Sequence, residues 1–264
     1  MATNIFDLTG KIALVTGASR GIGEAIAKLL AEQGAHAIVS SRKLDGCQAV
    51  ADQITADGGS AEALACHVGS MEQIEEAFAT IKGTFGKLDI LVNNAGVQFV
   101  APVEAFPTEK WDQILAINLS SAFHTTAAAL PGMRLRGWGR VVNIASAHGL
   151  TASPFKSAYV AAKHGVVGLT KTVALETAEE PITANAICPG YVLTPLLEAQ
   201  LPATMEKYGM DRETVIKNII LDRQPSRSFA TVEQLAGTCC FLCSNAADQI
   251  TGTTISMDGG WTAQ

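Results

Sequence analysis

The sequence is poor in charged and aromatic residues and has no long hydrophobic run. Charged residues make up 17% of its 264 residues, the formal net charge is −6, and lysine and arginine form no run or stripe. Nucleic acid is therefore not an expected partner, because neutralising its phosphates requires clustered basic side chains. No apolar stretch approaches the ~20 residues of a membrane span, and residues 1–10 lack the pattern of a signal peptide. We therefore expect a cytoplasmic protein that does not bind membranes.

Cysteine is also scarce, and its spacing does not favour a metal site. Cys240 and Cys243 form a C-x-x-C pair, which occurs in redox and zinc sites. However, this pair lies in an apolar helical run, and no second Cys or His pair stands at ligand spacing. We therefore predict that the six cysteines are small buried side chains and that the protein binds no metal.

The sequence is rich instead in short β-forming runs that alternate with longer amphipathic helices. In residues 22–30, apolar side chains recur at i, i+3, i+4, i+7 and i+8, the spacing of one helix face. Such alternation predicts an α/β fold, a single-domain Rossmann-type doubly wound parallel sheet with helices on both faces. The expected strands are residues 11–16, 35–40, 61–68, 88–93, 140–145, 182–188 and 253–257. The expected helices include residues 43–56, 108–135 and 157–177, with capping boxes at 70–73 and 231–234.

One segment interrupts the alternation. Residues 195–228 carry mixed charges and a helical pattern of their own. Long insertions in compact domains are usually functional, so this segment is expected to be a helical substrate lid. The sequence contains no repeat and no domain boundary. We expect one domain over residues 1–264, with a cofactor half at about 1–97 and a catalytic half at about 98–264.

A glycine-rich loop stands between the first expected strand and the first expected helix. Its spacing, G-x-x-x-G-x-G, lets the backbone turn tightly and approach a pyrophosphate, whose charge meets the helix N-terminus. An ordinary glycine-rich turn is the alternative, but the strand and helix beside the loop favour nucleotide binding. The expected cofactor contacts in this loop are Gly17, Ser19, Arg20, Gly21, Ile22 and Gly23.

The end of the second expected strand bears on the choice between NADP and NAD. NAD sites usually place an acidic residue there to bind the ribose 2′-hydroxyl. This chain has Ser41 and Arg42 instead, and an arginine can pair with a 2′-phosphate, as Arg20 also could. The alternative is that Arg42 belongs to a solvated helix start. NADP(H) is weakly preferred, with NAD(H) as the alternative.

Tyr159 and Lys163 carry the main catalytic signal. Their i, i+4 spacing places a phenol and an ammonium on one helix face. A phenol with a pKa near ~10 is a poor base at neutral pH, and a nearby positive charge lowers that pKa. The spacing alone is common by chance, but Ser146 ends an expected strand thirteen positions earlier and Asn118 lies in an expected helix.

Together these motifs resemble the short-chain dehydrogenase/reductase family over nearly the whole chain. The resemblance implies that Tyr159 is the general acid/base, that Ser146 binds the substrate oxygen, and that Lys163 holds the nicotinamide ribose. Asn118 would complete a proton relay. Further cofactor contacts are implied by the family's motifs after the third and fourth strands and by its P-G segment: His67, Val68, Asn94, Ala95, Gly96, Pro189, Gly190, Val192 and Thr194.

Polar residues near the expected reactive oxygen suggest a small carboxylate substrate. Lys156 lies one turn before Tyr159 and is therefore expected to share its helix face. His148 follows Ser146 by two positions. Gln98 follows the segment Asn93-Asn94-Ala95-Gly96, and Gln200 lies in the expected lid. Two cations and two amides suit a carboxylate. Alternatively, the polar side chains at 156 and 200 are simply exposed.

From about residue 93 onward the chain resembles bacterial D-3-hydroxybutyrate dehydrogenases. The shared segments are residues 106–111, 145–149, 156–165, 249–254 and 258–263. The resemblance implies that Gln98, His148, Lys156 and Gln200 hold the substrate carboxylate. It also implies that Tyr191 and Trp261 enclose the methyl end, although position 191 is usually Trp in that family.

The first ~92 residues resemble NADP-type carbonyl reductases of the same family, so the chain reads as a mosaic. The leading hypothesis is interconversion of (R)-3-hydroxybutyrate and acetoacetate by a homotetramer, the assembly that the family resemblance implies. One alternative is a broader NADP-dependent carbonyl or β-ketoacyl reductase. Another is a nucleotide-binding sensor without catalytic activity, against which the intact catalytic set argues.

Overall fold

Seven parallel strands form the sheet at the centre of the computed structural model, which describes residues 4–198 and 201–263. Their spatial order is β3-β2-β1-β4-β5-β6-β7, so the direction of winding reverses between β1 and β4. In such sheets ligands bind at the carboxyl ends of the strands, beside this reversal. The strands are β1 (Ile12–Thr16), β2 (His36–Ser41), β3 (Ser60–Ala65), β4 (Ile90–Asn93), β5 (Gly139–Ile144), β6 (Ile182–Pro189) and β7 (Thr254–Met257).

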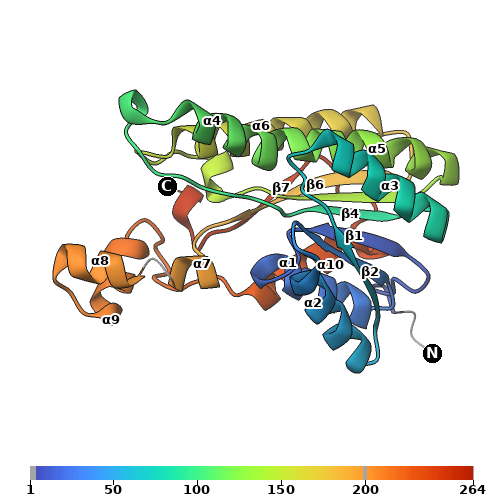
Figure 1. The fold of residues 1–264 in the computed structure, drawn as a ribbon, viewed down its shortest axis with the longest axis horizontal. Helices are drawn as coiled ribbons and strands as arrows, with labels where there is room; N and C mark the ends of the chain where they lie inside the picture. The colour runs from blue at the N-terminus through green and yellow to red at the C-terminus, as the bar shows by residue number, and fades with distance from the viewer. Residues whose placement is uncertain (1–3, 199–200, 264) are drawn as a thin grey trace.

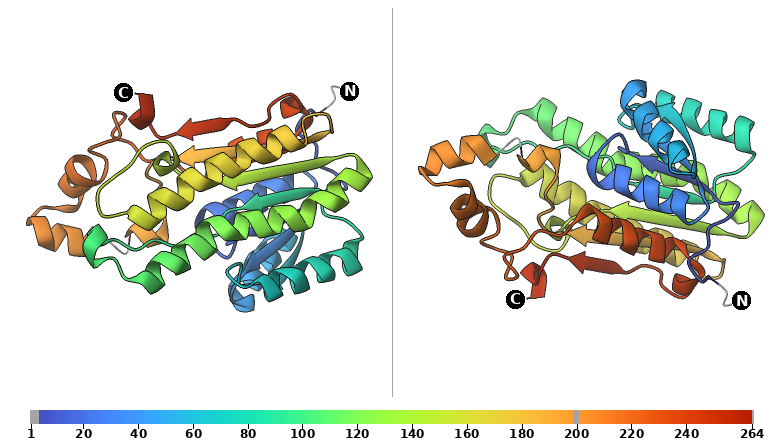
Figure 2. Two further views of the ribbon diagram at one scale, coloured as in Figure 1. Left: turned by 90° about the horizontal axis from the view of Figure 1, so that it is seen from above. Right: turned by 90° about the horizontal axis from the view of Figure 1, so that it is seen from below.

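Helices cover both faces of this sheet, which confirms the predicted doubly wound fold (Figures 1 and 2). Strands β1, β4, β5 and β6 are buried along their whole length, because both of their faces pack against helices. One layer consists of α1 (Gly21–Glu32), α2 (Leu44–Ala56) and α10 (Val232–Cys243). The other consists of α3 (Met71–Phe85), α4 (Thr108–Leu115), α5 (Ser121–Arg136) and α6 (Ser157–Glu176).

The segment 195–228 forms short helices that project beyond the carboxyl ends of the strands (Figure 1). They are α7 (Pro195–Glu198), α8 (Leu201–Tyr208), α9 (Arg212–Val215) and a π-helical turn at Ile216–Ile220. The buried side chain of Gln224 fastens the end of the segment, because its Oε1 accepts a 3.0 Å hydrogen bond from the Tyr191 backbone. The predicted helical pattern of this segment is therefore present.

Two predicted boundaries and one predicted helix-face position are wrong. The third strand ends at Ala65 because its neighbour β2 ends at Ser41, so residues 66–68 lie in the following loop. The helix predicted over 108–135 is interrupted by a π-helical turn at Ala116–Ser120. Lys156 lies at the N-cap of α6 with φ of −124°, so it precedes the helix instead of sharing its face.

The two predicted capping boxes differ from each other. Thr231 and Gln234 form the complete reciprocal box at the start of α10. At the start of α3, Ser70 accepts from the Gln73 backbone, but the Gln73 side chain accepts a 2.8 Å hydrogen bond from the His67 backbone instead. This glutamine therefore fixes the loop that follows β3.

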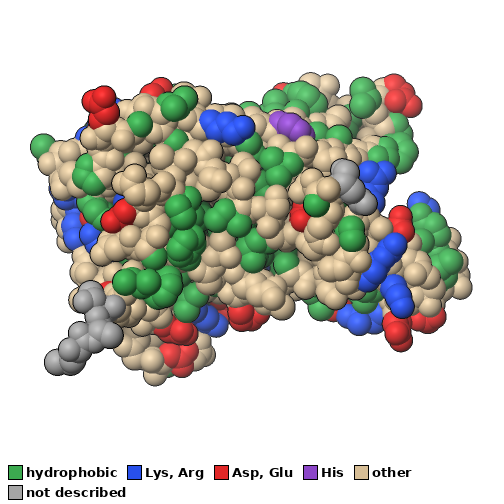
Figure 3. All heavy atoms as spheres, turned by 180° about the vertical axis from the view of Figure 1, so that it is seen from behind, with side chains coloured by type: hydrophobic (Ala, Val, Ile, Leu, Met, Phe, Trp, Pro, Cys, Tyr) green, Lys and Arg blue, Asp and Glu red, His purple; other side chains and the backbone are tan. Residues whose placement is uncertain are grey.

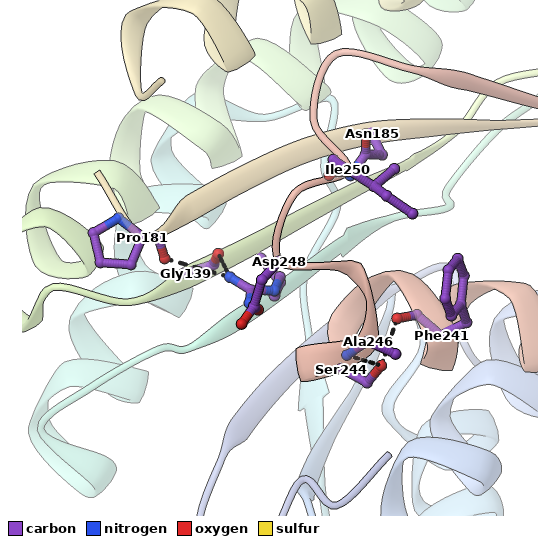
Figure 4. A network of polar contacts seen from close by, with 9 residues as sticks. Gly139, Pro181, Asn185, Phe241, Ser244, Ala246, Asp248 and Ile250 are labelled. Atoms are coloured by element: carbon purple, nitrogen blue, oxygen red, sulfur yellow. Dashed lines mark hydrogen bonds and ion pairs between the residues drawn. The ribbon is translucent and has the colours of Figure 1, made fainter. Parts of the chain in front are cut away.

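A polar network fastens the edge of the sheet opposite to these loops (Figure 4). The Arg140 guanidinium, only 2% exposed, pairs with Asp248 and donates to the carbonyls of Gly139 and Pro181. Asn185 binds the Ile250 carbonyl at 2.6 Å. A buried cation needs such partners, so this network ties the start of β5 to the segment that leads into β7.

All six cysteines are buried free thiols, as predicted. Burial raises the pKa of Cys66 and Cys188 to about 11, and that of Cys240 to about 12, which makes these thiols unreactive. Within residues 4–198 and 201–263, no cluster of three or more His, Cys, Asp or Glu side chains could hold a metal ion. In the same ranges, every helix is too short or too polar to cross a lipid bilayer.

Candidate active site

A cavity of about 510 Å³ opens at the carboxyl edge of the sheet, where β1 and β4 lie side by side. It contains most of the predicted cofactor contacts, together with four residues that were not predicted: Lys43, Cys66, Val97 and Ile117. The predicted residues in its wall are Gly17, Ser19, Arg20, Gly21, Ile22, Ser41, Arg42, His67, Val68, Asn94, Ala95, Gly96 and Thr194.

The glycine loop is shaped by close contacts with Asn94. Its Nδ2 donates to the carbonyls of Thr16 at 2.9 Å and Gly17 at 3.1 Å. A Cβ at position 23 would lie 2.4 Å from this nitrogen, and Gly17 has a φ of +65°. Gly23 thus lies beneath the cavity instead of lining it. The first turn of α1 has no side-chain cap, so its backbone N–H groups are available to an anion.

The charges around the cavity are positive. Arg20, Arg42 and Lys43 are exposed and line it, and none of its described lining residues carries a carboxylate. His67 also lines the cavity, and its Nδ1 accepts a 3.0 Å hydrogen bond from the Gly69 backbone. The predicted absence of an acidic residue at the end of β2 is therefore accompanied by three nearby cations.

Tyr159 and Lys163 project from α6 toward the carboxyl end of β5, as their spacing predicted. The Lys163 Nζ lies 5.7 Å from the centre of the Tyr159 ring and donates a 2.7 Å hydrogen bond to the Ile144 carbonyl. Only 5% of Lys163 is exposed, and Ser146 at the end of the same strand is 7% exposed. Strand β5 therefore positions both the serine and the ammonium next to the phenol.

Burial dominates the electrostatics of this group. It raises the pKa of Tyr159, and the hydrogen bond from Ser146 acts in the opposite direction. Burial also lowers the pKa of Lys163 to about 8. In the protein alone, desolvation of the phenolate therefore keeps the pKa of Tyr159 above its ordinary value, although Lys163 lies close to the ring.

Asn118 occupies the π-helical turn between α4 and α5. Its side chain forms two 2.8 Å hydrogen bonds with the backbone of Val97, one to the N–H and one to the carbonyl. A π-helical turn often marks a functional site, since it redirects one side chain out of the regular helix. Here the turn fastens the loop after β4 to the layer that carries Tyr159.

Aromatic rings enclose the other side of Tyr159. The His148 ring makes edge contacts with Tyr159 and Trp261, at centroid distances of 5.9 and 5.1 Å. Trp261 stacks on Tyr191 at 5.4 Å, and the Lys156 Nζ lies 5.9 Å from the Tyr191 ring. The structure thus brings His148, Lys156, Tyr191 and Trp261 together beside Tyr159.

The other predicted substrate and cofactor residues are less central. Gln98 is exposed in the loop after β4, and Gln200 lies outside the described residues. Pro189, Gly190 and Val192 do not line the cavity; a Cβ at Gly190 would meet the Gln224 side chain at 2.4 Å. These backbone positions therefore support the base of the 195–228 segment.

Arg223 is a site residue that the sequence analysis missed. Together with burial, its charge lowers the pKa of Lys156, and burial, Lys156 and Arg223 lower the pKa of His148 to about 4. Arg223 follows the helices of the 195–228 segment and is held next to the site by the neighbouring Gln224. No spacing in the sequence predicts this contact, because it depends on how that irregular segment folds back.

Comparisons with known proteins agree with this geometry. Residues 11–204 match the family model described as short chain dehydrogenase. The D-beta-hydroxybutyrate dehydrogenase of Rhizobium meliloti is 53% identical, over 96% of this chain and 99% of that protein. The D-beta-hydroxybutyrate dehydrogenase of Cupriavidus necator is 51% identical, over 97% of this chain and 100% of that protein. These similarities extend over both halves of the chain and are not confined to residues from about 93 onward.

A solved structure of a putative 2-deoxy-D-gluconate 3-dehydrogenase from Agrobacterium tumefaciens, with bound NADP, superposes with a TM-score of 0.87. It is 38% identical and covers 99% of this chain and 100% of that one. Fold, site and similarity agree along almost the whole sequence. The chain belongs to the short-chain dehydrogenase family.

Proposed function

We propose that the protein interconverts (R)-3-hydroxybutyrate and acetoacetate by hydride transfer to or from a nicotinamide cofactor. The observation that carries this proposal is the position of Lys156 beside the aromatic enclosure next to Tyr159. A small hydroxy acid needs both features, since one end is a carboxylate and the other a methyl group. The names of two relatives more than 50% identical to this chain support the same substrate.

The reacting oxygen would lie between Ser146 and Tyr159. In the oxidation, the Tyr159 oxygen would accept the hydroxyl proton, and a bound nicotinamide would supply the acceptor for the hydride that leaves the carbon bearing that hydroxyl. Ser146 donates a hydrogen bond to the substrate oxygen, and Lys163 holds the nicotinamide ribose. Asn118 would connect this group to solvent. Burial raises the pKa of Tyr159, so the positive charge of an oxidised nicotinamide would favour the phenolate that oxidation requires.

Substrate recognition would rest on charge at one end and shape at the other. Lys156 supplies the positive charge for the carboxylate, and Gln98, Gln200 and His148 complete that end of the site. Tyr191 and Trp261 enclose the methyl group, since their stacked rings form a flat apolar wall. The segment 195–228 would act as the lid over this pocket.

We propose NADP(H) as the preferred cofactor, with NAD(H) as the alternative. A 2′-phosphate beside Ser41 would face Arg20, Arg42 and Lys43, all of which line the cavity. An NAD site would normally offer a carboxylate there. The other proposed cofactor contacts are the remaining predicted residues of the cavity wall. They are completed by Gly23, Tyr159, Lys163, Pro189, Gly190 and Val192.

We also propose that the protein is a cytoplasmic homotetramer. Phe123 on α5, Leu135 on α5 and Leu175 on α6 are 53%, 88% and 79% exposed, which leaves apolar area on that layer. On the side where β7 forms the sheet edge, hydrophobic side chains gather across the middle and charged ones lie mostly toward the periphery (Figure 3). Two such faces suit a tetramer. A monomer or dimer in analytical ultracentrifugation would contradict this assembly.

The substrate proposal is tested by comparing acetoacetate with its methyl ester, in which the carboxylate is esterified and the charge is removed. The native protein should favour acetoacetate in kcat/KM, and Lys156→Met should remove that preference through a higher KM. Loss of the charged partner should cost about 2–5 kcal/mol in acetoacetate binding. The matched control is Lys171→Met, an exposed lysine on α6.

Equal turnover of the two compounds by the native protein would contradict the proposal and favour a broader carbonyl reductase. Nucleotide binding without turnover of any hydroxy acid or ketone would favour a sensor.

A further inference from the structure

The backbone of Phe155 has a conformation that bulky side chains rarely adopt. Its φ is +67°, in the left-handed region that suits glycine. In residues 4–198 and 201–263, Arg227 is the one other residue besides glycine with a positive φ. The Phe155 side chain is 54% exposed, so burial of the ring does not explain the conformation. Strained residues cluster at ligand sites, where the surrounding structure holds them in place.

Phe155 is the second central residue of a turn that leads into α6. The turn covers residues 153–156, with Pro154 at its first central position. Proline followed by a positive φ is the pattern of a type II turn, whose second central position is usually glycine. The Phe155 carbonyl accepts a 3.0 Å hydrogen bond from the Ala101 backbone. This contact ties the turn to the loop after β4, which also carries Gln98.

Both ends of this turn reach side chains of the candidate site. At its start, the Ser153 Oγ lies 2.9 Å from the His148 Nε2. At its end, Lys156 is the N-cap of α6, and its Nζ lies 5.9 Å from the centre of the Tyr191 ring. The turn therefore connects two of the residues proposed for the carboxylate end of the pocket.

The position of the Lys156 ammonium depends on where its backbone leaves the turn. Its Nζ forms no ion pair with a carboxylate of the described chain. A lysine has a flexible four-carbon stem, so without an ion pair the backbone sets the region that the ammonium can reach. With a negative φ at Phe155, the chain would enter α6 from another direction, and the Phe155 carbonyl would turn away from Ala101.

We propose that Phe155 is a positioning residue whose left-handed backbone closes the turn 153–156 and directs Lys156 to the carboxylate end of the substrate. This proposal rests on the proposed function and deepens it, because it concerns how the site selects an acid over an uncharged ketone. Phe155 acts through Lys156 and does not touch the reacting atoms. Its ring is not required, so a smaller residue that tolerates a positive φ should replace it.

Substitutions at position 155 separate the backbone conformation from the aromatic ring. Phe155→Asn removes the ring but tolerates a positive φ, which makes it the matched control. Phe155→Pro fixes φ near about −65°, so the turn cannot form. The Phe155 N–H donates no hydrogen bond within the described residues, so proline removes no donor that is in use. Phe155→Val is a milder variant, since a β-branched side chain disfavours a positive φ without forbidding it.

Each variant is assayed with acetoacetate and with its methyl ester. Phe155→Pro should raise the KM for acetoacetate by about tenfold or more, because Lys156 is no longer held in place. The kcat and the KM for the methyl ester should change little. Phe155→Val should show a smaller rise, and Phe155→Asn should match the native protein. In Lys156→Met protein, Phe155→Pro should cause no further rise, since the residue that it positions is gone.

The turn itself is tested without substrate, by hydrogen exchange of the Ala101 amide. Mass spectrometry at single-residue resolution should show this amide protected in the native protein and in Phe155→Asn. It should exchange faster in Phe155→Pro and Phe155→Val, because the bond to the carbonyl of residue 155 is lost or weakened. Thermal unfolding identifies any variant that has lost its general structure.

Equal protection of the Ala101 amide in all variants would overturn the proposal. Equal changes of KM for the acid and the ester would also overturn it, as would an additive effect of Phe155→Pro in Lys156→Met protein. A raised KM in Phe155→Asn would assign the effect to the ring and contradict the backbone role. If the native protein does not turn over acetoacetate, the proposed function is rejected, and exchange at Ala101 decides whether Phe155 holds the turn. The two failures are therefore distinguishable.

Discussion

At the scale of single residues, buried titratable groups surround the Ser146 hydroxyl, and each is shifted toward its neutral form. Burial raises the pKa of Tyr159 and lowers those of Lys163 and His148 to about 8 and about 4. Buried groups of this kind respond strongly to a charged ligand, because each new charge acts in a weakly screened environment. The charges of a bound cofactor and substrate would therefore shift the pKa values of these buried groups.

Removing the Tyr159 oxygen tests its role in proton transfer. Tyr159→Phe keeps the ring that packs on His148, so the fold should persist, but kcat should fall by about 10²–10⁴ because proton transfer to a positioned side chain is lost. Steady-state kinetics and thermal unfolding check both parts. A variant that retains more than a tenth of the native kcat would contradict the mechanism.

His148 makes the stability of the protein depend on pH. Its pKa is about 4 in the folded state, lowered by burial and by Lys156, Arg223 and His164, against an ordinary value of 6.5. The unfolded chain therefore binds more protons between these values, so this residue makes the free energy of unfolding fall as pH drops from 6.5 to 4. Urea denaturation at several pH values should show a shallower decline for His148→Gln. An equal decline of the unfolding free energy with falling pH in both proteins would mean that the buried imidazole does not contribute to this pH dependence.

At the scale of secondary-structure elements, the glycine loop and the loop after β4 form one unit. Asn94 bonds the backbone of Thr16 and Gly17, and Gly23 leaves the space in which its amide lies. The cofactor cavity thus depends on two loops that are far apart in the sequence.

Gly23→Ala should disrupt this unit. The new Cβ would lie 2.4 Å from the Asn94 Nδ2 and 2.7 Å from the Gly17 carbonyl oxygen. We expect a loss of stability of about 1–3 kcal/mol and at least tenfold weaker NADPH binding, measured by fluorescence titration. The control is Gly83→Ala in α3, where nothing lies within 4 Å, and which should gain roughly 0.5–1 kcal/mol. Native-like NADPH affinity in Gly23→Ala would contradict the role of this contact.

Many of the secondary-structure elements were predictable from the sequence. The periodicity of apolar residues and the spacing of glycines predicted the order of strands and helices along the chain, because apolar residues must face the layers they pack against. The candidate catalytic residues followed from strand ends and from the spacing of Tyr159 and Lys163. Arg223 was not predictable, since its proximity to His148 and Lys156 depends on the conformation of an irregular segment. The N-cap position of Lys156 was missed for the same reason.

At the scale of the whole molecule, the sheet brings a positively charged cavity and the aromatic residues around Tyr159 to one edge. The cavity lies beside the reversal of winding between β1 and β4, and the aromatic residues around Tyr159 follow the ends of β5, β6 and β7. The segment 195–228 projects from the same edge (Figure 2). Because both regions lie at one edge of the sheet, a single rate measurement can test the proposed cofactor and the proposed substrate together.

That measurement is the initial rate with (R)-3-hydroxybutyrate, in parallel with NADP and with NAD, and with the (S) enantiomer as the control. We predict turnover of the (R) enantiomer alone, with a lower KM for NADP than for NAD because Arg20, Arg42 and Lys43 line the cavity and would face a 2′-phosphate. A lower KM for NAD would reject the cofactor preference and leave the substrate proposal intact. No turnover of (R)-3-hydroxybutyrate with either cofactor would contradict the central claim.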